Sequence, residues 1–197
     1  IFMQNHLLIW NKSKLDISNS NLKGPHNIAN IMAAILATSE FKINNLEQTI
    51  NNFQPLAHRM EVVDKINGIT FINDSKATNT ESVKYALQSF SKPVNIIMGG
   101  QGKNEDYSVL NKLLKQHAKK IYLIGSSTED MENAFQNIVA TQRCKDLKEA
   151  VIKAYQQSKK EDIILLSPAC TSYDMFQNFE VRGNIFKKIV RDIKNDE

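Results

Sequence analysis

Cysteine is scarce in this sequence, and its spacing excludes a disulfide framework. The 197 residues contain two cysteines, Cys144 and Cys170, which lie on separate segments and form no CxxC pair. Small secreted domains that depend on disulfides carry more cysteines at closer spacing. The two cysteines therefore favour a reducing compartment, and we expect the protein in the cytoplasm.

Long apolar runs are also missing from the sequence. No stretch of about 18 consecutive apolar residues occurs, so we expect no membrane-spanning helix and no membrane partner. No signal peptide is visible either. The chain begins with Ile1-Phe2-Met3, which already resembles the interior of a fold, and we therefore expect a piece of a longer protein.

The charge distribution lacks the pattern of a nucleic-acid-binding protein. The net charge is +4, and the lysines are spread along the whole chain. Because no basic stripe carries interleaved aromatic residues, we expect no nucleic-acid partner. What is present is an ordinary globular composition, 42% hydrophobic and 23% charged, which suffices to bury a core. The length fits one large domain, or one domain with an appendage.

The first part of the chain predicts a small mixed region. The apolar run His6–Trp10 indicates an edge strand or hairpin, and the polar residues after it indicate a loop. Apolar residues then recur at helical spacing after Gly24-Pro25, and a second short helix is expected at 45–52. Because Pro55 breaks the chain, we expect two domains, at 1–54 and 55–197.

Strand-like and helical patterns alternate in the second part. The expected strands are 61–66, 69–72, 94–98, 121–124, 138–141 and 163–166, and the expected helices are 80–90, 107–118, 128–136, 147–158 and 174–193. This alternation predicts βαβ units and an α/β domain with a mostly parallel sheet. Asn67-Gly68, between the first two strands, predicts instead a β-hairpin with a primed turn.

Polar residues gather where the parallel strands end. The turns 73–79, 99–103, 125–128 and 167–172 follow four of the expected strands. Ligands of open parallel sheets bind at this edge, outside the carboxyl ends of the strands. We therefore expect Lys76, Thr78, Lys103 and Ser172 to lie around one edge, beside helix N-termini that supply amide donors. Two lysines and hydroxyl groups suit a small anion, a carboxylate or a phosphate.

Each of these residues also has a plainer interpretation. Thr78 or Asn79 can cap the next helix, and Ser172 can cap the last one. The run Gly99–Lys103 lacks the spacer of a P-loop and the Ser or Thr that follows its Lys, so it can be a tight turn. The remaining plain interpretations are a buried side chain for Cys170, a solvated pair for His58 and Arg59, and a water-facing helix surface for Asn27 and Asn30.

Several segments resemble the Mur ligase family. They are "GPHNIAN", "LAHRMEVV", "INDSKATN", "MGGQGK" and "LLSPACTSYDMFQNFEVRG", which occur in this order from about residue 24 to the C-terminus. The resemblance implies a Rossmann-like domain, with helices on both faces of its mostly parallel sheet, preceded by the remnant of a P-loop-type central ATPase domain. It also implies an ATP-dependent, ADP-forming ligase of peptidoglycan synthesis. That enzyme would phosphorylate the carboxylate of UDP-N-acetylmuramoyl-L-alanine, and the amine of D-glutamate would attack the acyl phosphate.

The resemblance also implies roles for individual residues. D-Glutamate is implied by Asn73-Asp74-Ser75-Lys76, where related ligases for other amino acids carry different residues. Lys76 would be the catalytic residue, between the two groups that follow. The ATP contacts would be Asn27, Asn30, His58, Arg59 and Asp74, and the D-glutamate contacts would be Thr78, Lys103, Ser172 and Phe179.

Parts of the implied enzyme do not occur in this sequence. There is no GxxxxGK[ST] segment, and the ligands of Mg²⁺ are expected in a part that would precede Ile1. We therefore expect no metal site and no catalysis in the 197 residues alone, and a monomeric parent enzyme. Two alternatives stay open, namely a related ligase such as a folylpolyglutamate synthase, and a separate α/β module that binds a nucleotide or carboxylate without turnover. An upstream P-loop in the full reading frame would eliminate the second.

Overall fold

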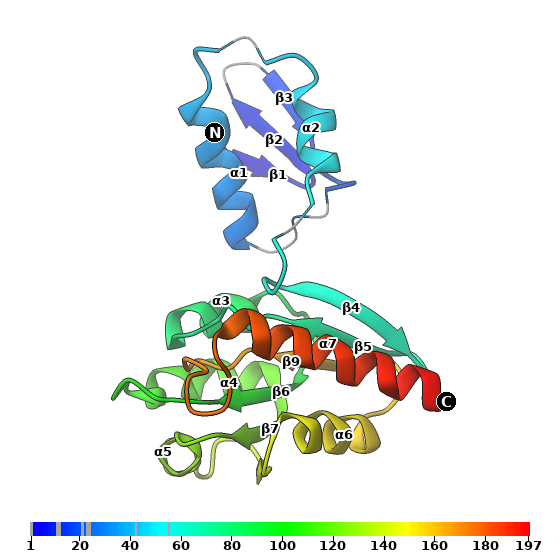
Figure 1. Ribbon diagram of the computed structural model, residues 1–197. Coiled ribbons are helices and arrows are strands. Elements are labelled where there is room, and N and C mark those ends of the chain that lie inside the picture. The colour runs from blue at the N-terminus through cyan, green and yellow to red at the C-terminus, as the bar shows by residue number, and fades with distance from the viewer. Residues whose placement is uncertain (1, 11–12, 21, 23–24, 42, 55) are drawn as a thin grey trace. The chain divides into compact units, whose positions relative to one another are not determined.

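The chain forms two compact units. The computed structural model describes residues 2–10, 13–20, 22, 25–41, 43–54 and 56–197, and it divides into units at 1–55 and 56–197 (Figure 1). Gly24 and Pro55, at which the sequence predicts a helix start and a chain break, lie outside the described residues. Within the described part of the chain, no helix is long and apolar enough to cross a membrane.

The first unit is a small antiparallel sheet with two helices. Its strands are β1 (Phe2–Gln4), β2 (Leu7–Trp10) and β3 (Ser13–Asp16), and its helices are α1 (Pro25–Ala37) and α2 (Leu46–Asn52). The predicted loop after β2 is wrong in part, because β3 occupies it. Leu15 explains the difference, since it pairs with Leu8 across the strands and is buried with Ile31 and Ile35 of α1. One buried side chain in a polar segment thus suffices to fix an edge strand.

The second unit contains a six-stranded sheet. Its strands are β4 (Glu61–Ile66), β5 (Ile69–Asn73), β6 (Val94–Gly99), β7 (Ala118–Ile124), β8 (Thr141–Arg143) and β9 (Ile163–Leu166), in the order β4-β5-β9-β6-β7-β8. β4 and β5 form the predicted antiparallel hairpin, with positive φ at both Asn67 and Gly68, as a primed turn requires. The other pairs are parallel. β9 comes last in the chain and lies in the middle of the sheet.

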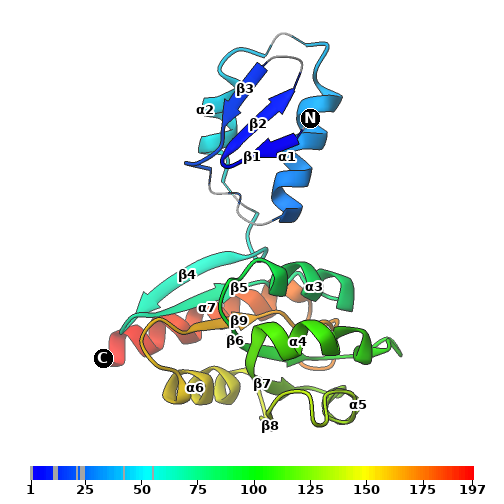
Figure 2. The same cartoon turned by 180° about the vertical axis from the view of Figure 1, so that it is seen from behind.

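Helices cover both faces of this sheet. The first face carries α3 (Thr80–Gln88), the 3₁₀ helix η1 (Tyr107–Leu110), α4 (Asn111–His117) and α5 (Thr128–Ala134), and the second carries α6 (Leu147–Gln157) and α7 (Phe179–Asp196) (Figures 1 and 2). Alternate strand residues supply the two cores. In β6, Ile96 and Met98 face the first layer, whereas Ile97 faces the second. The predicted fold class is confirmed.

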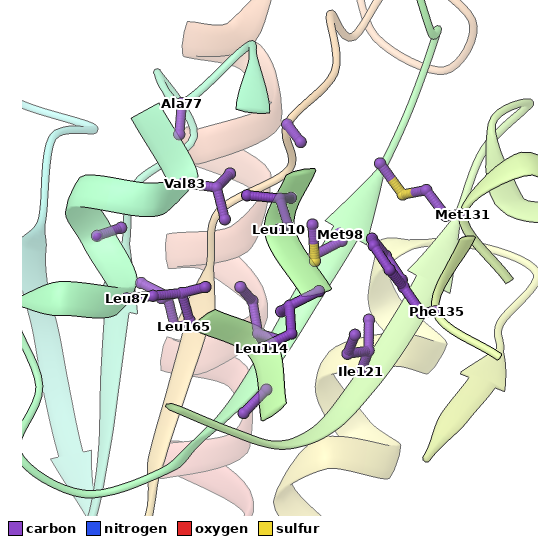
Figure 3. Packing of buried hydrophobic residues seen from close by; sticks show 14 of the residues in the cluster. Ala77, Val83, Leu87, Met98, Leu110, Leu114, Ile121, Met131, Phe135 and Leu165 are labelled. Carbon is purple, nitrogen blue, oxygen red and sulfur yellow. The ribbon is translucent and has the colours of Figure 1, made fainter. Parts of the chain in front are cut away.

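Figure 3 shows the core beneath the first layer. Val83 and Leu87 of α3 belong to this core together with Leu110 and Leu114, and the aromatic ring of Phe135 belongs to the same core. The sheet is therefore a buried platform whose strands hold their positions through packing on both faces. The turns that follow these strands therefore begin at strand ends whose positions are fixed by this packing.

Two predicted elements are displaced. The predicted strand 138–141 is wrong, because Ile138 and Val139 lie in a turn and pack against the first core, and β8 starts only at Thr141. The predicted helix start at 174 is also wrong. The Asn178 side chain accepts a hydrogen bond from the Val181 amide at 2.8 Å, which starts α7 at Phe179.

Candidate functional site

Three polar turns begin at neighbouring points of the sheet edge. β9 pairs in parallel with β5 and with β6, and its last residue, Leu166, lies beside Asn73 and Ile97. The turns 73–79, 99–103 and 167–172 consequently leave the sheet at the same edge. The turn 125–128 follows β7, whose last residue pairs with Gly99. The predicted convergence of the turns is observed.

The turn 73–79 is built on side chains that point inward. Asn73 and Ser75 are buried, and the side-chain oxygen Oδ1 of Asn73 accepts a hydrogen bond from the Ser75 backbone amide at 3.1 Å. Asn79 caps α3 by accepting from the Ser82 amide at 2.9 Å. The cap is therefore Asn79, and Thr78, which is half-buried, is left beside it at the start of the helix.

The carboxylate of Asp74 is almost fully buried, with 5% of the residue exposed. One oxygen accepts a hydrogen bond from the Met60 amide at 3.2 Å, and the other accepts from the Ser167 hydroxyl at 2.9 Å. Burial raises the pKa of Asp74 to about 7, against the opposite effect of these two hydrogen bonds and of Arg59. Both oxygens are occupied, so Asp74 ties the segment at Met60 to the end of β9.

His58 is buried, whereas its neighbour Arg59 is exposed, so they do not form a solvated pair. The Asn73 amide nitrogen lies 3.0 Å from Nδ1 of His58, and also reaches the carboxylate of Glu61 at 3.1 Å and the Gly183 carbonyl at 3.3 Å. Since the last two groups only accept, the side-chain nitrogen of Asn73 is the donor. Nδ1 of His58 therefore accepts, and the imidazole is neutral with its proton on Nε2.

The electrostatics agree with this neutral imidazole. Burial lowers the pKa of His58, and the positive charge of Lys187 lowers it further. The ring also packs edge-on against Phe179, with 6.1 Å between the ring centroids. His58 therefore joins the beginning of the second unit to α7.

Lys76 and Phe179 lie together. The Lys76 ammonium is 5.5 Å from the centre of the Phe179 ring, which is a cation–π distance. Phe179 begins α7, and its carbonyl accepts a hydrogen bond from the Ser75 hydroxyl at 2.8 Å. One residue predicted as catalytic and one predicted to contact D-glutamate are thus in contact with each other.

The glycine-rich run after β6 lies close to the backbone of the turn 167–172. Gly100 has φ 134°, and any β-carbon there would collide with the Thr171 carbonyl. That carbonyl also accepts from the Gln101 amide at 2.9 Å. The run is therefore a tight turn joined to the turn 167–172, and it presents Lys103, which is exposed, at the same edge.

Ser172 and Cys170 are buried in the turn 167–172. The Ser172 carbonyl accepts from two amides that follow it, and α7 is capped by Asn178, so Ser172 is not its cap. The Cys170 sulfur lies 3.2 Å from the Tyr107 hydroxyl and 3.3 Å from the Ser127 hydroxyl. The plainer interpretation of Cys170 as a small buried residue is confirmed.

Arg182 is the residue that the sequence reasoning missed. Its side chain is fully buried in α7, and its guanidinium donates to Ser75, Cys170 and Thr171. A signal for it was present, because Arg182 is in helical register with Phe186, Ile189 and Val190, which face the second core. An arginine on the apolar stripe of a helix indicates a buried polar network.

The remaining predictions concern two asparagines of the first unit and the metal. Asn27 and Asn30 lie on α1 of the first unit, Asn27 buried and Asn30 exposed, and their predicted contact with ATP stays a prediction. In the parts of the chain that the structure describes, no group of three or more His, Cys, Asp or Glu side chains could hold a metal ion. These residues do not fit a Mg²⁺ site, so we derive no step through the ion.

The fold and the turns define an α/β domain of a known family. Residues 58–170 match the family described as "Mur ligase, glutamate ligase domain", and the chain belongs to the Mur ligase family. Two relatives, from Caldicellulosiruptor saccharolyticus and Bdellovibrio bacteriovorus, carry the name UDP-N-acetylmuramoylalanine–D-glutamate ligase. They are 40% and 41% identical over 87% and 89% of this chain. The chain spans 39% and 38% of their lengths.

A solved structure shares the fold. The MurF ligase from Thermotoga maritima, in complex with ADP, superposes with a TM-score of 0.65 at 15% identity. The match covers 91% of this chain and 42% of that one. At this identity the likeness shows the fold alone.

Proposed function

We propose that this chain supplies the amino-acid side of the active site of a ligase that joins D-glutamate to UDP-N-acetylmuramoyl-L-alanine in peptidoglycan synthesis. The observation that supports the proposal is that the turns carrying Lys76, Lys103 and Ser172 leave three adjacent strands at one edge of the sheet, where Lys76 contacts Phe179 of α7. The names of the relatives support the substrate, because they are about 40% identical to nearly the whole chain. A reaction with an ATP and a UDP-linked substrate would take place in the cytoplasm.

The chemistry begins with activation of a carboxylate. A carboxylate oxygen of the UDP-linked substrate attacks the γ-phosphorus of ATP, and ADP leaves. The amine of D-glutamate then attacks the carbonyl carbon of the acyl phosphate and loses a proton, and the tetrahedral intermediate expels inorganic phosphate to give the amide. Most of the rate enhancement in such a reaction comes from positioning and charge neutralisation.

The residues of the second unit suit the amino-acid substrate. Lys103 is exposed at the edge and can pair with a carboxylate of D-glutamate. Thr78 at the start of α3 offers a hydroxyl group beside helix amides, and Ser172 and Phe179 border the other side. We place Lys76 between this group and the acyl phosphate, where its ammonium would neutralise charge in the transition state.

We propose ATP contacts in each unit separately. Asn27 and Asn30 are proposed ATP contacts on α1, with residues 1–54 forming the remnant of a central ATPase domain. Arg59 is exposed in the segment that Asp74 fixes through the Met60 amide. We propose that Asp74 and His58 serve ATP by holding this segment, and that Arg59 reaches the nucleotide. The ADP complex of the MurF ligase supports an adenine nucleotide as the ligand.

The test is phosphate release by the intact ligase that contains this chain, purified as a monomer. Release should require ATP, Mg²⁺, UDP-N-acetylmuramoyl-L-alanine and D-glutamate together, and the 197-residue chain alone should release none. Turnover with a folate and L-glutamate in place of the two substrates would overturn the proposal. Turnover by the 197-residue chain alone would overturn its role as one side of a shared site.

A further inference from the structure

Arg182 is a buried cation with neutral partners. Its Nε donates to the Ser75 hydroxyl at 2.9 Å, and one terminal nitrogen donates to the Ser75 carbonyl at 2.7 Å. The other terminal nitrogen reaches the carbonyls of Cys170 at 3.1 Å and Thr171 at 3.3 Å. None of the ion pairs between described residues includes Arg182. The guanidinium is thus surrounded by backbone oxygens.

Stability alone does not account for this arrangement. Burying a charged group is costly, and an apolar side chain of similar volume often serves a fold equally well or better. Burial lowers the pKa of Arg182 only to about 10, so the guanidinium remains charged at neutral pH. What the charge provides is a rigid fork that holds several carbonyls at once. The role of Arg182 can therefore be inferred from the positions of the carbonyl groups that accept its hydrogen bonds.

Two of the three residues that accept hydrogen bonds from Arg182, Ser75 and Thr171, lie next to residues of the proposed site. Ser75 precedes Lys76, and Thr171 precedes Ser172. The Ser75 hydroxyl accepts from Arg182 and donates onward to the carbonyl of Phe179, which is itself a proposed contact. The Thr171 carbonyl also accepts from the Gln101 amide, in the turn that carries Lys103. One side chain thus links all three turns and the start of α7.

We infer that Arg182 is a positioning residue for the acidic amino-acid substrate. It acts through the backbone at Ser75 and Thr171, which sets the distances among Lys76, Ser172 and Phe179. Its positive charge forms no ion pair within the described part of the chain and is offset only through space by Asp174, so it also makes this edge of the sheet more favourable for an anion. The inference rests on the proposed function for the identity of the substrate, but its geometry does not depend on that identity.

The test compares Arg182→Lys and Ser75→Ala with wild type in the intact ligase. Lysine keeps the charge but cannot hold the three carbonyls and the hydroxyl together. We expect Arg182→Lys to raise the KM for D-glutamate about tenfold, the effect of one misplaced charge-assisted contact, and to leave the KM for ATP within about twofold. Ser75→Ala removes only the hydroxyl link, so its shift should be smaller and in the same direction.

Arg191→Lys is the matched control, because Arg191 is exposed on the same helix. It should leave both KM values unchanged. If Arg182→Lys lowers the melting temperature and changes neither KM, or changes both equally, the inference is overturned. If Arg182→Lys does not fold, Ser75→Ala decides alone by the same criteria. If wild type uses a different amino acid, the proposed function fails, and the KM for that amino acid becomes the readout for Arg182.

Discussion

The imidazole of His58 lies directly over the α-carbon of Gly183. A β-carbon at position 183 would collide with Nδ1 of His58, and its three nearest atoms would all belong to that ring. The two residues are far apart in sequence, one at the beginning of the second unit and one in α7. Gly183 is therefore required by close approach, although its helical conformation would suit alanine.

The first prediction is that Gly183→Ala destabilises the wild-type protein but stabilises the His58→Ala variant. Gly183→Ala in wild type should destabilise the protein by about 1–3 kcal/mol, the usual cost of overpacking. In a His58→Ala background the collision is absent, and the same change should stabilise by up to about 1 kcal/mol through helix propensity. Urea unfolding of the four variants measures the cycle. An equal cost in both backgrounds would show that the imidazole is not the obstacle.

The second prediction concerns the pH dependence of stability at Asp74. The folded carboxyl keeps its proton up to about pH 7, whereas the unfolded carboxyl loses it near its ordinary value of 3.8. Between these values the folded state binds more protons, so this group's contribution to the free energy of unfolding falls as pH rises and is fully lost above about 7.

Asp74→Asn should remove this dependence. The stability of wild type relative to Asp74→Asn should therefore fall by on the order of 1 kcal/mol per pH unit through the middle of the window. Unfolding by urea at several pH values measures the difference. Asp130→Asn, at an exposed position, is the control and should show no such trend. A flat difference for Asp74→Asn would mean that its carboxyl is ionised throughout.

The third prediction separates the two substrates at Lys103. In the intact ligase, Lys103→Ala should raise the KM for D-glutamate by about one to two orders of magnitude, because a charge-assisted contact contributes about 1.5–3 kcal/mol. The KM for ATP should change little. Steady-state kinetics with each substrate varied in turn decide the matter. Equal effects on both KM values would assign Lys103 to the phosphate instead.

The fourth prediction uses the neighbours Thr78 and Asn79. Asn79 caps α3, so Asn79→Ala should lower the free energy of unfolding by about 1 kcal/mol and leave the KM for D-glutamate unchanged. Thr78→Val should do the reverse, raising that KM with little change in stability. Melting curves and kinetics on the same preparations give both quantities. If Thr78→Val behaves like Asn79→Ala, its assignment to the substrate is wrong.

Local patterns predicted most of the second unit. Asn67-Gly68 predicted the hairpin because both residues accept positive φ, and the apolar run at 94–98 predicted β6, which the structure buries on both faces. Sequence patterns gave wrong predictions where tertiary contacts determined the secondary structure. Ile138 and Val139 are residue types that favour strands, but they lie in a turn and pack against the first core. Leu15 lies in a polar segment, but it belongs to a strand because it pairs with Leu8.

The sequence predicted where the site lies, but it did not predict the hydrogen bonds among the side chains of the site. The polar turns after β5, β6 and β9 follow from topology alone. The side-chain bonds within them do not, because they depend on which residues three distant segments bring together. Asp74 seemed available to a ligand, yet Met60 and Ser167 occupy both its oxygens. Arg182 acts across more than 100 residues of sequence, from α7 to Ser75.

The central place of β9 has a consequence for synthesis on the ribosome. Before residues 163–166 are made, the chain has no strand that can join the half-sheet of β4 and β5 to the half-sheet of β6, β7 and β8. Each half has an unpaired edge that can recruit another nascent chain. Residues 163–166 pair with both edges, so the polar turns can meet only after these residues have been made. A truncated chain that ends before Ile163 therefore contains Lys76 and Lys103 but cannot assemble the site.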